Sequence, residues 1–238
     1  MLLKDLSRRH AAKPTFLHDP AREVEVYRRI LMPAGLGPRV HGVDESLILM
    51  EKVDGVELWQ LEHEAWLRTA SWAATMHATL AGRAGERCLL RLDSRFYAAW
   101  PARADLDATL EHAYEQASVR LLALPRIVIH NELYPANVVV GGDRIVAIDW
   151  ELGAAGPGVL DLAALTTGWD EDRAAAIAAA YGHVDELDLA AARLHLAVRW
   201  LGWGARWTPP PEHARDWRAE ARAAAERLVA GRTRSPRR

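Results

Sequence analysis

The sequence has few of the features that mark secreted, membrane-embedded or nucleic-acid-binding proteins. Its 238 residues include a single cysteine, Cys88, which excludes an intramolecular disulfide and fits a reducing compartment. The formal net charge is -2, without the basic patch or stripe expected of a nucleic-acid-binding protein. No apolar run approaches the roughly 18 residues of a membrane span, and Met1 to His10 is too charged for a signal peptide. We therefore expect a cytoplasmic protein that binds neither nucleic acid nor membrane.

The sequence also lacks internal repeats and low-complexity linkers, so it reads as one unit. Half of its residues are apolar, which is enough for two small cores that share a cleft. Six scattered histidines have no metal-ligand spacing, so a zinc site is not expected: His63, His77, His112, His183, His195 and His213. The basic run at residues 232–238 is expected to be a disordered tail.

The most informative stretch lies between Arg126 and Glu151. In order, it contains an apolar strand, the loop His130–Asn137, the strand Val138–Val140, the turn Gly141–Asp143 and the strand Ile145–Ile148. The glycine-rich turn between two apolar runs is a strong hairpin signal. Asn137 precedes the first hairpin strand and Asp149 follows the second. Because a hairpin brings its two open ends side by side, both side chains can converge on one ion.

This arrangement indicates phosphoryl-transfer chemistry. Moving a γ-phosphoryl group requires Mg²⁺ held on the phosphate oxygens and a carboxylate beside the attacking hydroxyl. Mg²⁺ takes oxygen ligands, usually one or two carboxylates together with substrate phosphates and water. Asp149 and Asn137 meet that demand, and Glu132 supplies the further carboxylate.

The same stretch resembles the catalytic segment of the aminoglycoside phosphotransferase family, whose usual pattern is His-Gly-Asp-x-x-x-x-Asn followed by Ile-Asp-Trp/Phe-Glu. The matching residues are His130, Glu132, Asn137 and Asp149. In the segment Gly156–Ala163 that follows, Asp161 resembles the buried Asp that braces the catalytic loop.

The resemblance implies an α+β, protein-kinase-like two-lobed fold, with a small β-rich N-lobe and a larger, mainly helical C-lobe. It implies ATP and Mg²⁺ as cofactors and a hydroxyl of a small molecule as the phosphoryl acceptor. Glu132 and His130 then occupy the catalytic positions, with His130 expected to orient the backbone and the metal-binding Asp rather than to transfer protons. Asn137 and Asp149 would hold the metal.

The catalytic loop also departs from the family pattern. Glu132 stands where the family has Asp, Asn131 stands where it has Gly, and Leu133–Ala136 replaces Leu-His-Pro-Gly. The extra methylene of Glu moves the carboxylate, and a misplacement of about 1 Å in such a site can cost on the order of a hundredfold in rate. Glu132 is therefore either a working base or the mark of a slow or silent enzyme.

At the N-terminus, the sequence predicts a short strand over Leu2–Leu6 and a helix over Asp19–Leu31. Asp19 is a favourable N-cap and Pro20 suits the first helical position. The apolar residues within the helix repeat at helical spacing.

The resemblance assigns Lys4 to the nucleotide phosphates and pairs it with Glu23 on the helix, with Glu25 as a less favoured partner. In the family, a glycine-rich hairpin precedes the lysine strand, but only Met1 to Leu3 precede Lys4 here. We therefore expect a truncated small lobe, and an upstream start, a reduced lobe or a loss of ATP binding all remain open.

The rest of the small lobe is predicted as the strands Arg39–Val43 and Leu47–Val53. The resemblance places the adenine edge against Met50, Glu51, Lys52 and Val53. The lobes are then residues 1–53 and 54–231. Helices are predicted at Leu61–Leu80, Ser94–Ala102, Asp105–Leu122, Asp170–Tyr181, Asp185–Gly204 and Pro211–Ala230.

Two functions remain open: a kinase that phosphorylates a small molecule, and a pseudokinase-like binding protein of the same fold. The acceptor also remains open among aminoglycosides, sugars and amino alcohols, and so does the oligomeric state. Trp200 and Trp203 are candidates for the wall of the acceptor pocket, because the family's C-terminal helices help to form it. A polycationic aminoglycoside is disfavoured by the arginines of the acceptor-side segments, Arg193, Arg199, Arg206, Arg215 and Arg218.

Overall fold

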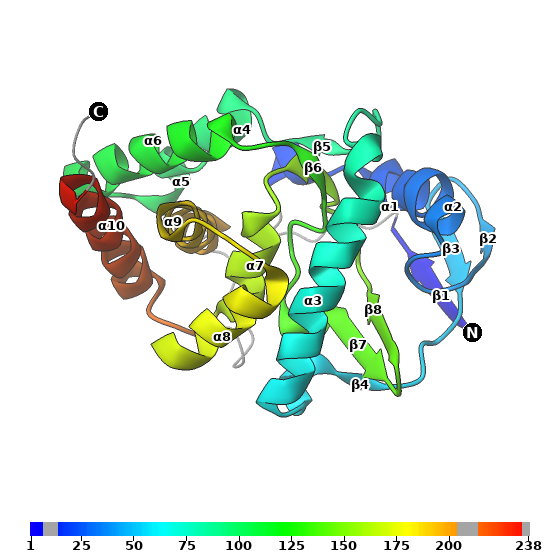
Figure 1. Cartoon of the computed structure of the whole chain (residues 1–238). Coiled ribbons are helices and arrows are strands. Elements are labelled where there is room, and N and C mark those ends of the chain that lie inside the picture. Colours follow the sequence, from blue (N-terminus) through cyan, green and yellow to red (C-terminus); the bar gives the residue numbers. More distant parts are fainter. Residues whose placement is uncertain (7–13, 204–213, 235–238) are drawn as a thin grey trace. The chain divides into compact units, whose positions relative to one another are not determined.

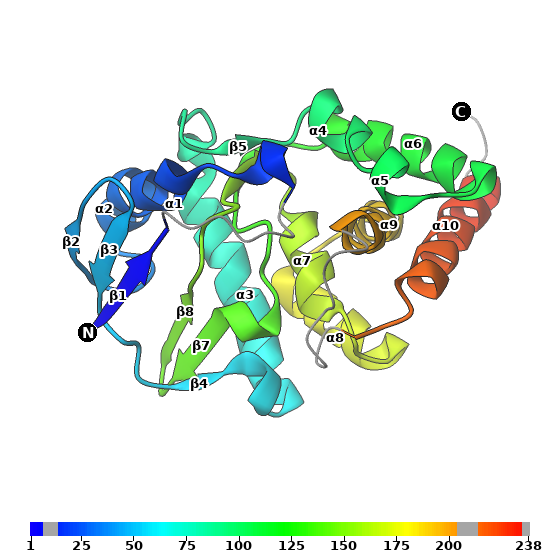
Figure 2. The ribbon, with the colours of Figure 1, turned by 180° about the vertical axis from the view of Figure 1, so that it is seen from behind.

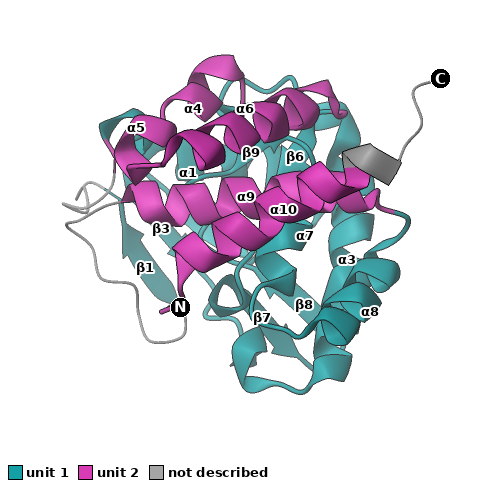
Figure 3. Ribbon diagram, turned by 90° about the vertical axis from the view of Figure 1, so that its left-hand side faces the viewer, with its two compact units in different colours: residues 1–11, 15–91, 126–183 teal, residues 12–14, 92–125, 184–238 magenta. Residues whose placement is uncertain are grey.

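The structure is a computed structural model that describes residues 1–6, 14–203 and 214–234. These residues form two compact units, drawn in different colours in Figure 3. The described part of unit 1 comprises residues 1–6, 15–91 and 126–183, and that of unit 2 comprises 14, 92–125, 184–203 and 214–234. Arg206, His213 and residues 235–238, about which the sequence makes predictions, lie outside the described residues.

A small antiparallel sheet of unit 1 contains the lysine strand. Its order is β1-β3-β2, with β1 at Leu2–Asp5, β3 at Leu47–Met50 and β2 at Val40–Val43. All three predicted strands are confirmed, although β3 ends three residues before the predicted Val53. Lys4 lies opposite Ile48 in the β1–β3 register.

The first helix is longer than predicted. It runs without a break through α1 (Pro20–Val26), a π-helical turn (Tyr27–Leu31) and α2 (Met32–Ala34). The carboxylate of Asp19 accepts the N–H of Ala21 at 3.1 Å, as expected of an N-cap. Pro33 has no N–H to donate within the helix, and the carbonyl of Arg29, four residues earlier, instead accepts the guanidinium of Arg83 at 2.9 Å.

The predicted hairpin forms in a second antiparallel sheet of order β4-β7-β8. The strands are β4 (Val56–Glu57), β7 (Val138–Gly141) and β8 (Arg144–Ala147). Gly142 in the turn has φ of 58°, a left-handed value that glycine adopts at little cost. Gly55 is required by proximity, because a Cβ at this position would lie 2.5 Å from the carbonyl oxygen of Val140.

Unit 1 also contains a third sheet, short 3₁₀ helices and three further helices (Figures 1 and 2). The sheet has the order β5-β9-β6, with β5 at Leu90–Arg91, β9 at Ala154–Gly156 and β6 at Ile127–Ile129. The 3₁₀ helices are η1 (Thr15–Leu17), η3 (Leu58–Gln60), η4 (Ala81–Arg83) and η5 (Pro135–Asn137). The α-helices are α3 (His63–Leu80), α7 (Val159–Thr166) and α8 (Glu171–Tyr181).

Two of these helices bear on the site. Helix α3 contacts the hairpin turn, where Arg68 donates to the carbonyl of Gly142 at 3.0 Å. Helix α7 was not predicted, because all of its residues are buried and it therefore lacks the polar face that reveals a helical period.

Unit 2 is helical. It contains α4 (Ser94–Ala98), α5 (Pro101–Ala104), α6 (Ala108–Ala123), α9 (Glu186–Trp203) and α10 (Trp217–Arg234). Both flagged tryptophans stack on other tryptophans of this unit: Trp200 on Trp217 at 5.2 Å and Trp203 on Trp100 at 6.3 Å between ring centroids. Helix α10 includes residues 232–234 of the expected tail.

The two units divide the chain differently from the predicted lobes at residues 1–53 and 54–231, and the lobe boundary therefore stays a proposal. Within the described part of the chain, no helix has the length and hydropathy needed to cross a membrane.

Candidate active site

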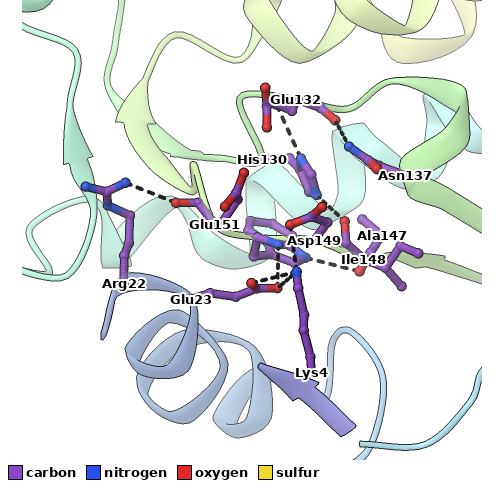
Figure 4. A network of polar contacts seen from close by, with 11 residues as sticks. Lys4, Arg22, Glu23, His130, Glu132, Asn137, Ala147, Ile148, Asp149 and Glu151 are labelled. Carbon is purple, nitrogen blue, oxygen red and sulfur yellow. Dashed lines mark hydrogen bonds and ion pairs between the residues drawn. The ribbon is translucent and has the colours of Figure 1, made fainter. Parts of the chain in front are cut away.

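Lys4 is the centre of the candidate site. Its ammonium lies 2.7 and 2.9 Å from the two carboxylate oxygens of Glu23 and 2.8 Å from Oδ1 of Asp149, as Figure 4 shows. The structure thus forms the predicted pair of Lys4 with Glu23. Glu25 instead contacts Arg28 at 3.2 Å. The contact between Lys4 and Asp149 was not predicted, and it joins β1, α1 and the segment after β8.

The charges of this cluster are strongly coupled. Glu23 is almost fully buried, which together with Asp149 raises its pKa to about 7, although Lys4 acts in the opposite direction. Burial lowers the pKa of Lys4, but the two carboxylates outweigh burial and the net shift is upward. A cation shared by two carboxylates leaves one negative charge in excess when both are ionised. Such a cluster is suited to accept a further cation at Asp149.

Glu23→Gln is expected to change how stability depends on pH. A carboxyl whose pKa rises on folding, from 4.5 to about 7 here, favours the folded state below the lower value and loses this contribution as pH rises through the higher one. The melting temperature of the parent protein minus that of Glu23→Gln should therefore fall between about pH 4.5 and 7 and then level off. Differential scanning fluorimetry of both proteins in EDTA measures this difference. A difference that rises with pH across this window would contradict the raised pKa of Glu23.

Asp149 has an unusual backbone that its neighbours hold in place. Its φ is 64°, in the left-handed region that few residues other than glycine adopt. The N–H of Ile148 donates to the carbonyl of Asn137 at 2.9 Å, and the carbonyl of Ile148 lies 2.8 Å from Nε2 of His130. The hairpin therefore brings Asn137 opposite the residue before Asp149, as the turn signal predicted.

His130, at the start of the catalytic loop, contacts the backbone at both ends of its ring. Its Nδ1 accepts the N–H of Glu132 at 3.3 Å, so the ring donates from Nε2 to Ile148. Burial lowers the pKa of His130, although Asp161 opposes the shift. In this structure His130 is a neutral ring with both nitrogens engaged, a geometry that suits the expected orienting role.

Asn137 is oriented by the same loop. Its amide nitrogen donates to the carbonyl oxygen of Glu132 at 2.9 Å. The amide oxygen is therefore the atom of Asn137 that could bind a metal.

A buried hydrogen-bond network holds the start of the loop His130–Asn137. Asp161, with no exposed surface, accepts the N–H groups of His130 at 2.8 Å and Asn131 at 2.7 Å. Its Oδ2 also lies 2.9 Å from Nε2 of His77, whose Nδ1 lies 2.7 Å from the hydroxyl of Tyr181. The sequence suggested the bracing role of Asp161. It missed His77, because no local pattern distinguishes this histidine from the other scattered ones.

The residues expected at the adenine edge follow β3. Met50 is the buried last residue of that strand. The N–H of Glu51 donates to the carbonyl of Arg39 at 2.8 Å, and its carboxylate contacts Arg144 at 2.5 Å. Lys52 and Val53 continue outside regular structure. Their contact with adenine stays a prediction, and the engaged N–H of Glu51 leaves its carbonyl as the more available backbone group.

The donors near Asp149 fit Mg²⁺ better than a transition metal. Among the residues that the structure describes, no group of three or more His, Cys, Asp or Glu side chains could hold a metal ion. Asp149 and Asn137 offer a partly exposed carboxylate and an amide oxygen. Two hard oxygen donors match the way Mg²⁺ is held, with phosphates and water completing the shell.

Comparisons with known proteins agree with this geometry. The chain matches the phosphotransferase enzyme family over residues 8–195. No curated protein sequence is similar enough to this chain to count as a match.

Among solved structures, the choline kinase LicA from Streptococcus pneumoniae is similar, with 16% identity, a TM-score of 0.64 and coverage of 98% of this chain and 86% of the other. A choline/ethanolamine kinase family protein from Mesorhizobium loti has 18% identity and a TM-score of 0.61, covering 92% and 80%. Aminoglycoside 2'-phosphotransferase-IIIa has 16% identity and a TM-score of 0.58, covering 89% and 82%. The predicted fold and resemblance are thereby confirmed: the chain belongs to the phosphotransferase enzyme family and has its protein-kinase-like fold.

Proposed function

We propose that the protein is an ATP- and Mg²⁺-dependent O-phosphotransferase that acts on a hydroxyl of a small molecule. Proteins of this family and fold are phosphotransferases of small molecules. The observation that carries the proposal for this chain is the ammonium of Lys4 held between Glu23 and Asp149. It brings a phosphate-binding cation beside a carboxylate that can bind a metal.

Each residue has a role in this proposal. Lys4 binds the nucleotide phosphates and Glu23 holds its ammonium in place. Asp149 and Asn137 hold Mg²⁺, which when bound neutralises charge on the phosphate oxygens. Glu132 accepts the proton of the acceptor hydroxyl, and Met50 to Val53 line the adenine edge. These roles require ATP, which fits the proposed cytoplasmic location.

The acceptor is proposed to be an amino alcohol or a sugar. Solved proteins with this fold include choline kinases and aminoglycoside phosphotransferases, some in complex with AMP, GDP or ATP. The described C-terminal helices carry several arginines, among them Arg193, Arg199 and Arg218, which disfavour a polycationic acceptor. A monocationic or neutral hydroxyl compound meets less repulsion.

Nucleotide binding tests the proposal directly. ATP with Mg²⁺ is expected to raise the melting temperature, because a ligand that binds only the folded state stabilises it by about 2.7 kcal/mol at 100 times its Kd. The same nucleotide with EDTA should give a smaller shift. No shift at millimolar ATP with Mg²⁺ would contradict the kinase and favour the pseudokinase-like protein, a possibility that the Glu132 substitution keeps open.

Glu132→Gln tests the proposed base. The amide keeps the shape of the side chain and loses its basicity, so turnover of an identified acceptor should fall by a factor of about 10² to 10⁴ with nucleotide affinity unchanged. Glu132→Asp is the matched control, since it restores the carboxylate that the family usually carries. A Glu132→Gln variant as fast as the parent would mean that another group, or no base, takes the proton.

A further inference from the structure

Arg22 is a buried arginine that the proposed chemistry does not use. Only 6% of the residue is exposed. Its Nη1 donates to two carbonyl oxygens, those of Leu17 and Glu151, each at 3.0 Å. Figure 4 shows the guanidinium reaching from α1 to the backbone of Glu151.

Glu23, the next residue of α1, makes a second contact with the segment that follows Asp149, residues 149–153, which we call the Asp149 loop. Oε1 of Glu23 accepts the N–H of Trp150 at 3.1 Å. Consecutive residues of α1, Arg22 and Glu23, therefore hold Glu151 and Trp150, the consecutive residues that follow Asp149. Two side chains of α1 thus bind the backbone of this loop at two consecutive residues.

The loop needs such support because Asp149 itself is strained. A left-handed φ of 64° persists in a residue other than glycine only where the surroundings hold it. The hydrogen bonds of Ile148 fix the chain before Asp149. The bonds from Arg22 and Glu23 fix the chain after it.

Arg22 is an expensive group to bury for packing alone. Burial lowers its pKa, and the carboxylate oxygen Oδ2 of Asp19 lies 3.7 Å from its Nη2, too far for a hydrogen bond. A desolvated guanidinium needs hydrogen-bond acceptors, and here it obtains them from two backbone carbonyls. One belongs to the segment before α1 and the other to the loop after Asp149, so its contacts join these two segments.

We propose that Arg22 is a positioning residue for Asp149: by holding the carbonyl of Glu151, it fixes the loop that presents the metal-binding carboxylate. The inference rests on the proposed function, in which Asp149 holds Mg²⁺. Groups that orient metal ligands from behind typically contribute about 10- to 100-fold to metal affinity.

The test compares Arg22→Met with Arg28→Met. Met keeps much of the apolar stem of arginine and loses the donors. Arg28 is a half-exposed arginine of the same continuous helix, and its guanidinium contacts Glu25 instead of the loop. Hydrogen exchange of the backbone over residues 149–153 reports the hold on the loop without any ligand. Metal binding is measured by titrating Mg²⁺ in the presence of ADP and recording the melting temperature relative to that of an EDTA sample. The Mg²⁺ concentration at half of the maximal thermal shift is the Mg²⁺ midpoint.

Arg22→Met is expected to speed exchange at residues 149–153 and to raise the Mg²⁺ midpoint by about 10- to 100-fold. ADP binding in EDTA and all values for Arg28→Met should match the parent. An Arg22→Met variant that only melts at lower temperature, with parent-like exchange at 149–153 and a parent-like Mg²⁺ midpoint, would overturn the proposal.

Two further outcomes are decisive. If Arg22→Met does not fold, Arg22→Lys takes its place, because its single ammonium keeps the charge but lacks the planar fork of donors; a parent-like Mg²⁺ midpoint in that variant overturns the proposal and a raised one supports it. If the parent itself gains nothing from Mg²⁺, the proposed function fails. Exchange at residues 149–153 then still decides whether Arg22 holds the loop.

Discussion

Asp149→Asn is expected to abolish Mg²⁺-dependent phosphoryl transfer, with turnover lower by a factor on the order of 10³ or more. Removing a single group that stabilises transition-state charge typically costs 10² to 10³ in rate, and Asp149 is the only carboxylate in the proposed metal shell. The Asn side chain is neutral and offers one oxygen in place of two. Both Mg²⁺ affinity and the charge balance around Lys4 should therefore change.

The same substitution should leave the fold intact, which makes the activity loss interpretable. Asn tolerates the left-handed backbone of residue 149, with φ of 64°, better than Ala would. Lys4 keeps its contacts of 2.7 and 2.9 Å with Glu23. With one negative charge removed next to Glu23, the pKa of Glu23 should move down and its ion pair with Lys4 should strengthen, so the melting temperature is expected to stay level or rise.

Transfer of the γ-phosphoryl group from ATP to a panel of choline, ethanolamine, sugars and water measures the effect. Asp143→Asn is the matched control, because Asp143 lies on the exposed turn of the same hairpin and the same charge is removed far from the open end. Its turnover should equal that of the parent. If Asp149→Asn retained a tenth or more of the parent turnover with Mg²⁺, the metal would have to be held elsewhere.

The parts of this site that sequence could predict are those governed by local rules. Asp19 and Pro20 mark the start of α1, and the Gly141–Asp143 turn sets the hairpin that brings Asn137 next to Ile148. Such signals depend on a few neighbouring residues and the period of the apolar positions. They were sufficient to place β1, α1, β7 and β8, and the family resemblance added the pairing of Lys4 with Glu23.

What sequence could not supply are contacts between distant segments. The bond of Arg22 to Glu151 and that of His77 to Asp161 join residues whose spacing along the chain carries no period. The contact of Lys4 with Asp149 depends on how β1 meets the hairpin. A fully buried helix is also hard to predict from sequence: α7 is buried on every side and so gives no amphipathic signal.

Asp161→Ala is expected to cause the largest loss of stability of any variant considered, about 3 to 5 kcal/mol. The carboxylate is fully buried and accepts two backbone N–H groups, from His130 and Asn131, and its Oδ2 lies 2.9 Å from His77. Deleting one member of a buried charged network typically costs this much, because each orphaned donor loses about 1 to 3 kcal/mol. For a chain of this size, the melting temperature should fall by about 10 °C.

A substitution of His77 tests whether Asp161 stabilises the fold through the two backbone N–H groups or through its contact with the imidazole. His77→Phe fills similar space but removes the contact with Asp161 and the 2.7 Å contact with Tyr181, while both backbone N–H groups keep their acceptor. The loss of stability in His77→Phe should therefore be smaller, about 1 to 2 kcal/mol.

The region around His77 is tightly packed. A Cβ on Gly158 would lie 2.6 Å from the Tyr181 hydroxyl and 3.0 Å from Nδ1 of His77.

Urea unfolding of Asp161→Ala, His77→Phe and the exposed control Asp172→Asn measures the order directly. The expected order of destabilisation is Asp161→Ala first, His77→Phe second and Asp172→Asn near zero, since exposed charges away from networks contribute little. A His77→Phe variant as unstable as Asp161→Ala would mean that the imidazole, rather than the two backbone N–H groups, accounts for most of the stability. The catalytic loop would then depend on α3 for its position more than on α7.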